Sequence, residues 1–166
     1  MIFGIGTDIV EIKRIETMTS LDKFASKILS HNEKEFYDSL TNQKQIVYIS
    51  KQFAAKEAIA KAIGTGIRND AHFKNIEILR DKNGAPIFNA LNKLEKTISD
   101  LGISRTHVSL ADERDYAIAI AVLEKLIILF RNKICHHLFL KNLLIILVLS
   151  LIHISEPTRL LSISDG

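Results

Sequence analysis

The feature that most limits what this chain can fold into is an abrupt change of composition near Lys125. Up to that residue, charged and apolar side chains alternate with regular periods and turn signals recur, as in a globular domain. Beyond it the apolar residues run together, and residues 138–154 contain a single Lys, Arg, Asp or Glu side chain, that of Lys141. We therefore predict one folded domain over residues 1–125 and a separate apolar tail over residues 126–166.

Three interpretations of the tail compete. A membrane anchor fits the apolar run over residues 142–154, but a helical span needs about 20 residues and this run is shorter. An additional buried helix is disfavoured because the run has no polar face to present to solvent. Residues 150–159, SLIHISEPTR, resemble the translated adapter text that ends many predicted metagenomic proteins. We favour read-through or adapter-derived sequence for the tail and assign it no function.

Composition and charge exclude several classes of function. The net charge of +3 is small for 166 residues, and no run of five Lys or Arg residues indicates a nucleic-acid arm. Cys135 is the only cysteine, which excludes an intrachain disulfide and a zinc site with paired thiolates. The first residues lack the basic start, apolar middle and small-residue cleavage site of a secretory signal. We therefore expect a cytoplasmic protein.

Periodicity predicts a single small α+β domain, a mostly antiparallel sheet packed with a long central helix. An opening strand is expected over residues 2–10, followed by short helices over residues 11–18, 20–29 and 32–40. Ser30 and Glu33 form a capping box before the third of these helices. The central helix is predicted over residues 45–63. The remaining predictions are a hairpin around Asn83-Gly84, a helix over residues 91–101 and strands over residues 106–110 and 116–123.

Two carboxylates are the candidates for chemistry. Asp8 lies near the end of the opening strand, and Glu57 lies on an apolar stripe of the central helix. Each has a structural explanation, because Asp8 with Glu11 fits a helix cap and Glu57 fits an ion pair with Lys61 one turn later. From the pattern alone these structural explanations are favoured. Together, however, the two carboxylates supply the hard oxygen ligands that Mg²⁺ prefers, with positions left for water and a substrate phosphate.

Two segments resemble a known family. They are GIGTDIVEIKR over residues 4–14 and FAAKEAIAKAIGTG over residues 53–66. Both are similar to the signature motifs of bacterial holo-acyl-carrier-protein synthases, which are 4'-phosphopantetheinyl transferases, and the similarity continues to residue 124. The resemblance implies transfer of 4'-phosphopantetheine from coenzyme A to a serine of apo acyl carrier protein, releasing adenosine 3',5'-bisphosphate and supporting fatty acid biosynthesis. It also implies the family's fold, a Mg²⁺ cofactor and a homotrimer with active sites between subunits.

The same resemblance assigns roles to individual residues. Asp8 and Glu57 are expected to bind Mg²⁺ and to act in catalysis with Lys61, which would stabilise or protonate the leaving phosphate. From the sequence pattern alone, Lys56 and Lys61 fit a solvated helix face. Gly64 and Gly66 fit a helix C-cap, and His107 fits a structural position in a strand. Gln52 stands where the family commonly has Arg, which puts one phosphate contact in question. The expected ligands of coenzyme A are Lys56, Gly64, Thr65, Gly66 and His107.

An acidic carrier protein calls for a local cationic patch on its transferase, because opposite charge speeds their encounter. The candidate charges of this patch are Lys13, Arg14, Lys23 and Lys27, and Met18 and Phe24 are expected to add apolar contacts beside them. Three other interpretations stay open. One is a small binding module with a Lys-rich helix and no Mg²⁺ requirement, another is a transferase for a peptide or polyketide synthase carrier, and the third is a tail-anchored membrane protein.

Overall fold

The computed structural model describes residues 1–126, so the predictions for residues 127–166 lie outside the described part of the chain. Residues Met1–Leu126 form one compact unit. Every predicted helix and strand of this part is present, with ends that differ by a few residues. In chain order the elements are β1 (Ile2–Glu11), α1 (Ile12–Glu16), α2 (Leu21–Ile28), α3 (His31–Asp38), α4 (Asn42–Ile63), the 3-10 turn η1 (Phe73–Asn75), β2 (Ile76–Arg80), β3 (Pro86–Ala90), α5 (Lys93–Asp100), β4 (Ile103–Asp112) and β5 (Tyr116–Lys125).

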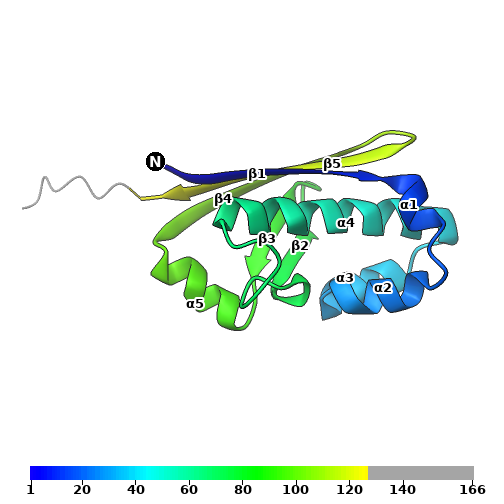
Figure 1. Cartoon of the computed structure of the whole chain (residues 1–166), viewed down its shortest axis with the longest axis horizontal. Helices are drawn as coiled ribbons and strands as arrows, with labels where there is room; N and C mark the ends of the chain where they lie inside the picture. Colours follow the sequence, from blue (N-terminus) through cyan, green and yellow to red (C-terminus); the bar gives the residue numbers. More distant parts are fainter. Residues whose placement is uncertain (127–166) are drawn as a thin grey trace, which may run out of the picture. The chain divides into compact units, whose positions relative to one another are not determined.

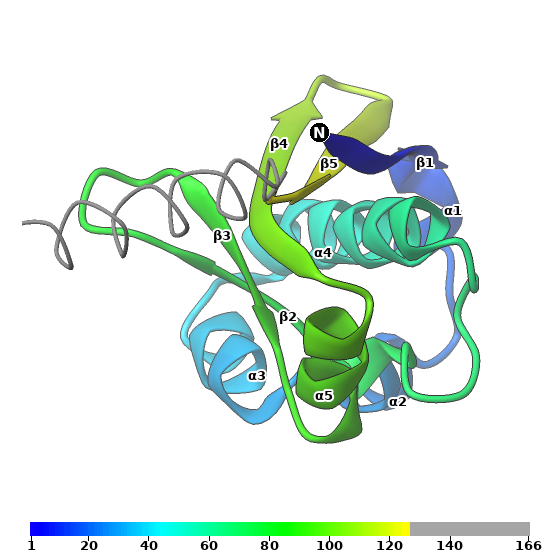
Figure 2. The ribbon, with the colours of Figure 1, turned by 90° about the vertical axis from the view of Figure 1, so that its left-hand side faces the viewer.

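The strands form two antiparallel sheets, one with the order β1-β5-β4 and one made by the β2-β3 hairpin. The long helix α4 lies along one face of the three-stranded sheet (Figure 1). Seen nearly along α4, the hairpin, α2 and α3 lie on the side of the helix away from that sheet (Figure 2). This arrangement confirms the predicted α+β fold with antiparallel pairing around a central helix.

Small residues let β1 and the sheet approach α4 closely. A Cβ atom at Gly6 would lie 1.9 Å from the carbonyl oxygen of Ala58, and one at Gly4 would lie 2.0 Å from that of Ala62. Side chains alternate along a strand, so Asp8 shares this inner face with the two glycines. The close approach therefore places the Asp8 carboxylate beside α4. Strand β5 contributes the fully buried Ala119 and Ala121 to the same face, along with Ala117.

The outer face of the three-stranded sheet is apolar and exposed. Its largest apolar side chains on β1 are Ile5 and Ile9, which are 62% and 60% exposed. Ile9 is directly paired with Ile118 of β5, so the apolar side chains lie side by side across the strands. These side chains put several large apolar groups in contact with solvent on one face of the sheet. The exposed members on β5 are Tyr116, Ile118 and Ile120.

Local signals at the ends of helices are also confirmed. Ser30 Oγ accepts a hydrogen bond from the Glu33 backbone N–H, and the Glu33 carboxylate accepts one from the Ser30 N–H at 2.7 Å, which completes the capping box. Gly64 ends α4 with a left-handed backbone, φ 89°, that glycine adopts without strain. Within residues 1–126, no helix combines the length and the apolar character needed to cross a membrane.

Candidate active site

The contact between β1 and α4 brings Asp8, Glu57 and Lys61 together at one surface. Lys61 Nζ donates hydrogen bonds to Asp8 Oδ1 at 2.8 Å and to the Thr7 carbonyl oxygen at 2.9 Å. The Lys61 side chain is 50% exposed and that of Asp8 only 17% exposed. The carboxylate is thus held against the helix while the ammonium group lies at the solvent side.

Glu57 completes this cluster from the preceding turn of α4. Burial raises the pKa of its carboxyl group, and the negative charge of Asp8 raises it further, while the positive charge of Lys61 opposes both effects. The two carboxylates therefore feel each other's charge across the interface of strand and helix. Such a pair is stabilised by a cation placed between them.

Both structural explanations of these carboxylates are wrong. Among the described residues Lys61 forms its ion pair with Asp8, and no ion pair joins it to Glu57. Helix α1 has Glu11 at its N-cap position, and no side chain there accepts a capping hydrogen bond, so Asp8 does not cap the helix. Asp8 and Glu57 therefore lie in the cluster without the structural role that the sequence pattern suggested.

The residues of the cluster fit a magnesium ion better than zinc. Within residues 1–126, no group of three or more His, Cys, Asp and Glu side chains gathers as a metal cage. Two carboxylates suit a hard cation that keeps water and substrate phosphate among its ligands, as Mg²⁺ does. The ammonium group of Lys61 already shows that the Asp8 carboxylate accepts a cation at this place.

Lys56 is a correction to the sequence analysis, because it lies in the interior and not at the surface. Its side chain is 0% exposed, and Nζ lies 2.6 Å from Glu33 Oε2 and 2.9 Å from the Phe73 carbonyl oxygen. The Ile76 carbonyl oxygen accepts its remaining hydrogen bond. An ammonium group has only three donors, and all are used here. The prediction that Lys56 grips a phosphate of coenzyme A is therefore wrong in this structure.

The buried ammonium group belongs to a network that orients α4. Burial lowers the pKa of Lys56, and the adjacent Glu33 carboxylate opposes that shift. Glu33 also accepts a hydrogen bond from the Ile78 N–H at 2.8 Å, which joins α3, α4 and β2. Glu77, itself 3% exposed, accepts a 2.7 Å hydrogen bond from Ser30 Oγ. Because Lys56 precedes Glu57, this network fixes the helix rotation that turns Glu57 toward Asp8.

The residues predicted to bind coenzyme A at the end of α4, Gly64, Thr65 and Gly66, form hydrogen bonds within the chain. The N–H of Gly64 bonds to the Lys61 carbonyl oxygen at 3.0 Å, and that of Gly66 bonds to the Ala60 carbonyl oxygen at 3.1 Å. Both N–H groups close the helix, and the roles of Gly64 and Gly66 toward coenzyme A stay predictions. The role of Thr65 stays a prediction; its hydroxyl group donates a hydrogen bond to the carbonyl oxygen of Gly66 at 3.0 Å.

His107 lies on β4, on the exposed outer face of the three-stranded sheet. Its Nε2 atom is 3.1 Å from Glu124 Oε2, and its side chain is 60% exposed. A neighbouring carboxylate and open solvent are compatible with a ligand at this position and do not require one. The role of His107 toward coenzyme A stays a prediction.

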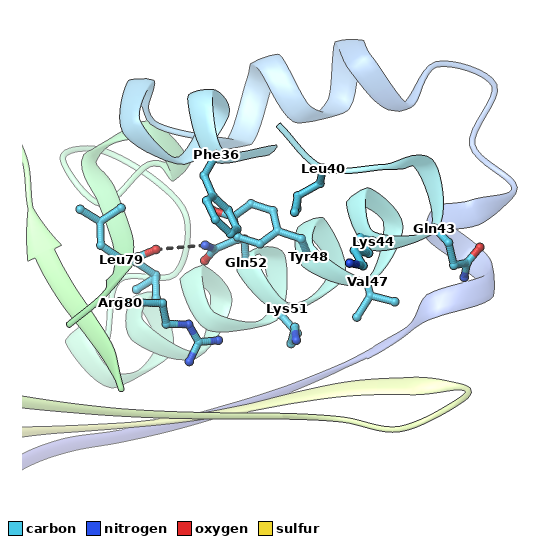
Figure 3. A pocket seen from close by; sticks show the side chains of 11 residues that line it. Phe36, Leu40, Gln43, Lys44, Val47, Tyr48, Lys51, Gln52, Leu79 and Arg80 are labelled. Carbon is cyan, nitrogen blue, oxygen red and sulfur yellow. Dashed lines mark hydrogen bonds between the residues drawn. The ribbon is translucent and has the colours of Figure 1, made fainter. Parts of the chain in front are cut away.

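A groove that the sequence analysis missed lies between α3, α4 and β2 (Figure 3). It has a volume of about 620 Å³ and contains neither Asp8 nor Glu57. Gln52 donates a 3.0 Å hydrogen bond to the Ile78 carbonyl oxygen, and its Oε1 atom has no partner among the described residues. Three cations line the groove, Lys44, Lys51 and Arg80, together with the aromatic rings of Phe36 and Tyr48.

The groove and the carboxylates face different sides of α4. Gln52 and Glu57 are five residues apart, which corresponds to about 140° around a helix. The spacing of Lys44, Tyr48 and Lys51 by four and three residues is the one signal in the sequence that predicts a shared face. Arg80 joins them only through the packing of the hairpin.

The predicted carrier-binding residues lie on α1, α2 and the turn between them. Arg14 and Lys23 are exposed, whereas Met18 and Phe24 are partly buried against the core. The ring of Phe24 packs on that of Phe53, with centroids 5.5 Å apart. The charged members are free to meet a partner, but the apolar members already have structural contacts.

Comparison with known proteins places this geometry in context. The model of the 4'-phosphopantetheinyl transferase superfamily matches residues 4–121. The holo-[acyl-carrier-protein] synthase of Enterobacter sp. (strain 638) is 45% identical over 125 residues, which cover 74% of this chain and 98% of that protein. The crystal structure of the Neisseria meningitidis synthase shares 43% identity with a TM-score of 0.71, over 75% of this chain and 100% of that one. The Bacillus anthracis synthase in complex with CoA (3',5'-ADP) shares 37% identity with a TM-score of 0.66, over 76% of this chain and 99% of that one.

Proposed function

Because the chain belongs to the 4'-phosphopantetheinyl transferase superfamily, we propose that it converts apo acyl carrier protein to the holo form. The 4'-phosphopantetheine group moves from coenzyme A to a carrier serine, and adenosine 3',5'-bisphosphate is released. The observation that carries this proposal is the convergence of Asp8, Glu57 and Lys61 at the contact of β1 with α4. In the cell the reaction would serve fatty acid biosynthesis in the cytoplasm.

Magnesium is part of the proposal, with Asp8 and Glu57 as its protein ligands. When bound, Mg²⁺ supplies positive charge against the pyrophosphate of coenzyme A. The half-exposed Lys61 ammonium group is long and flexible enough to donate to an oxygen of the leaving phosphate.

We also propose a homotrimer assembled through the outer face of the three-stranded sheet. The support is its apolar side chains, among them Ile9 at 60% and Ile120 at 47% exposure. Subunit contact would remove this surface from water. Sedimentation velocity should give a trimer for the full chain and a monomer for Ile120→Asp. A monomeric wild type at assay concentration would contradict this part of the proposal.

The groove of a neighbouring subunit is proposed to hold the nucleotide end of coenzyme A. In one chain the groove lies on a different side of α4 from the two carboxylates, which favours a ligand shared between two subunits. In the groove, Arg80 and Lys44 would contact the 3'-phosphate, and the ring of Tyr48 would stack on the adenine. The carrier protein would approach the carboxylates over α1 and α2, where Arg14 and Lys23 are exposed.

The test is to incubate the full chain with apo acyl carrier protein, coenzyme A and Mg²⁺ and to weigh the carrier by mass spectrometry. We expect the carrier to gain one phosphopantetheine, with an equal amount of adenosine 3',5'-bisphosphate measured by chromatography. A carrier with its acceptor serine changed to alanine is the matched control and should gain nothing. No gain by folded protein, with carriers from fatty acid, polyketide and peptide synthesis all tried, would favour the binding-module interpretation.

A further inference from the structure

We propose that Lys61 acts as a placeholder cation that occupies Asp8 in the metal-free protein and is released when the metal binds. The inference rests on the proposed function in one respect, namely that Asp8 and Glu57 hold the metal. Lys61 Nζ contacts Asp8 Oδ1 at 2.8 Å, and its 2.9 Å hydrogen bond to the Thr7 carbonyl oxygen reinforces this contact.

The contact is specific to one of the two carboxylates. Among the described ion pairs, Lys61 is the cation that contacts Asp8, and no Lys, Arg or His side chain pairs with Glu57. Asp8 is also the more enclosed partner, at 17% exposure against 50% for Lys61. The mobile member of the pair is therefore the lysine, while strand β1 and the packed glycines hold the carboxylate in place.

An ammonium group and a divalent cation at this carboxylate exclude each other for two reasons. Both are attracted by the negative charge of the same carboxylate, whose Oδ1 atom the Lys61 ammonium group already contacts, and their positive charges repel at contact distance. A metal that enters at Asp8 must therefore move the Lys61 ammonium group away. Its side chain then extends from the last turn of α4 into solvent, where a substrate phosphate can arrive.

One residue would thus serve two steps in turn. Before metal binding, Lys61 neutralises Asp8 and keeps its carboxylate oriented toward α4. After metal binding, the freed ammonium group is available to a phosphate oxygen. This order predicts that metal binding precedes productive binding of coenzyme A, and that Lys61 weakens the affinity for the metal while it strengthens the contact with the phosphate.

The first test measures metal affinity in the full chain by calorimetry with Mg²⁺ and by electron paramagnetic resonance with Mn²⁺. Lys61→Met should bind either ion about threefold more tightly or better, since the competitor is gone. Lys34→Met also removes a lysine from an ion pair, the one with Asp38 of α3, so its metal affinity should equal that of the wild type. Equal or weaker binding by Lys61→Met would overturn the inference, and so would binding of neither ion by any variant.

The second test follows the ammonium group directly. Lysine acylation by a water-soluble amine reagent, read by peptide mass spectrometry, should label Lys61 faster in Mg²⁺ than in chelator. Lys51 in the same sample serves as the internal control and should not respond. In Asp8→Asn the labelling of Lys61 should already be fast and insensitive to Mg²⁺.

Labelling of Lys61 that ignores Mg²⁺ in a wild type that binds the metal would overturn the placeholder role. Failure of this inference is distinguishable from failure of the proposed function, because the same samples are assayed for carrier conversion. Conversion without a metal response at Lys61 contradicts the placeholder role alone. A metal response at Lys61 without conversion by any carrier contradicts the transferase alone.

Discussion

Glu57 keeps a carboxylate half buried beside a second carboxylate, which costs folding free energy unless a cation offsets it. The nearest positive charge, Lys61, makes its contact with Asp8 instead. The metal-free site is therefore a strained electrostatic arrangement whose cost falls mainly on Glu57. A divalent cation would turn the same arrangement into a stabilising one, because it neutralises both carboxylates together.

This balance predicts that Glu57→Gln raises the melting temperature in chelator and lowers it in Mg²⁺. The folded-state pKa of Glu57 lies above its unfolded value, so the wild type loses stability as pH rises through the folded pKa. In chelator at pH 7 the variant should therefore melt at a higher temperature than the wild type. Below about pH 4.3, the ordinary value for Glu, both states hold the proton and this advantage should fade.

In Mg²⁺ the order should reverse, because only the wild type keeps both carboxylates. Differential scanning calorimetry across the pH range, with and without Mg²⁺, measures both effects. Glu95→Gln, at an exposed position of α5, is the matched control and should behave as the wild type. A wild type that melts above Glu57→Gln at pH 7 in chelator would contradict this account of the site.

Sequence predicted the members of the cluster but not their pairing. The motif around Asp8, Glu57 and Lys61 was sufficient to place them in one site, whereas the partner of Lys61 depends on how β1 packs on α4. The sequence could not show that Lys56 is buried, because its ion-pair partner Glu33 belongs to a different helix. The orientation of an isolated helix does not show which lysine finds a buried partner.

At the scale of elements, the contact of β1 with α4 decides the geometry of the site. Gly4 and Gly6 are needed because the helix backbone occupies the space that a Cβ atom would take. The sequence pattern identified the strand and its two faces, but it could not show that helix carbonyl groups lie against the glycines. That information is tertiary, because the two segments are about fifty residues apart in the chain.

Gly6→Ala should lower the free energy of unfolding by about 3 kcal/mol, because the added methyl group forces the strand away from the helix. Urea unfolding followed by circular dichroism measures the change. Glu11→Ala, at an exposed position at the end of the same strand, should change it by less than about 0.5 kcal/mol. A Gly6→Ala protein as stable as the wild type would show that the strand and helix are less tightly packed than described.

At the scale of the whole molecule, two features support the proposed homotrimer. The outer face of the three-stranded sheet is apolar and exposed, and the carboxylates and the groove lie on different sides of α4. Sequence predicted the late hairpin of β4 and β5, because its strands are close in the chain and separated by a turn. It did not predict that β1 pairs with β5, since Ile9 and Ile118 come together only through long-range pairing. The groove likewise needs α3, α4 and β2 at once, and its local signal is limited to the spacing of Lys44, Tyr48 and Lys51 on α4.

Subunit mixing tests whether the site is shared. Asp8→Asn lacks a carboxylate and Arg80→Ala lacks a cation of the groove, so each variant alone should be nearly inactive. If each site takes its carboxylates and its groove from different subunits, unfolding and refolding an equal mixture should restore about one quarter of wild-type activity. Carrier conversion is measured by mass spectrometry. A mixture no more active than the two variants apart would place the whole site in one chain.

The central claim is that Asp8 and Glu57 support a metal-dependent transfer of phosphopantetheine. It is tested most directly by the initial rate of carrier conversion in Mg²⁺ and in chelator, for the wild type, Asp8→Asn, Glu57→Gln and the control Glu95→Gln. We predict conversion in Mg²⁺ by the wild type and the control, its loss in chelator, and a decrease of about 100-fold or more in each site variant. Equal rates with and without Mg²⁺, or wild-type rates in both site variants, would contradict the claim.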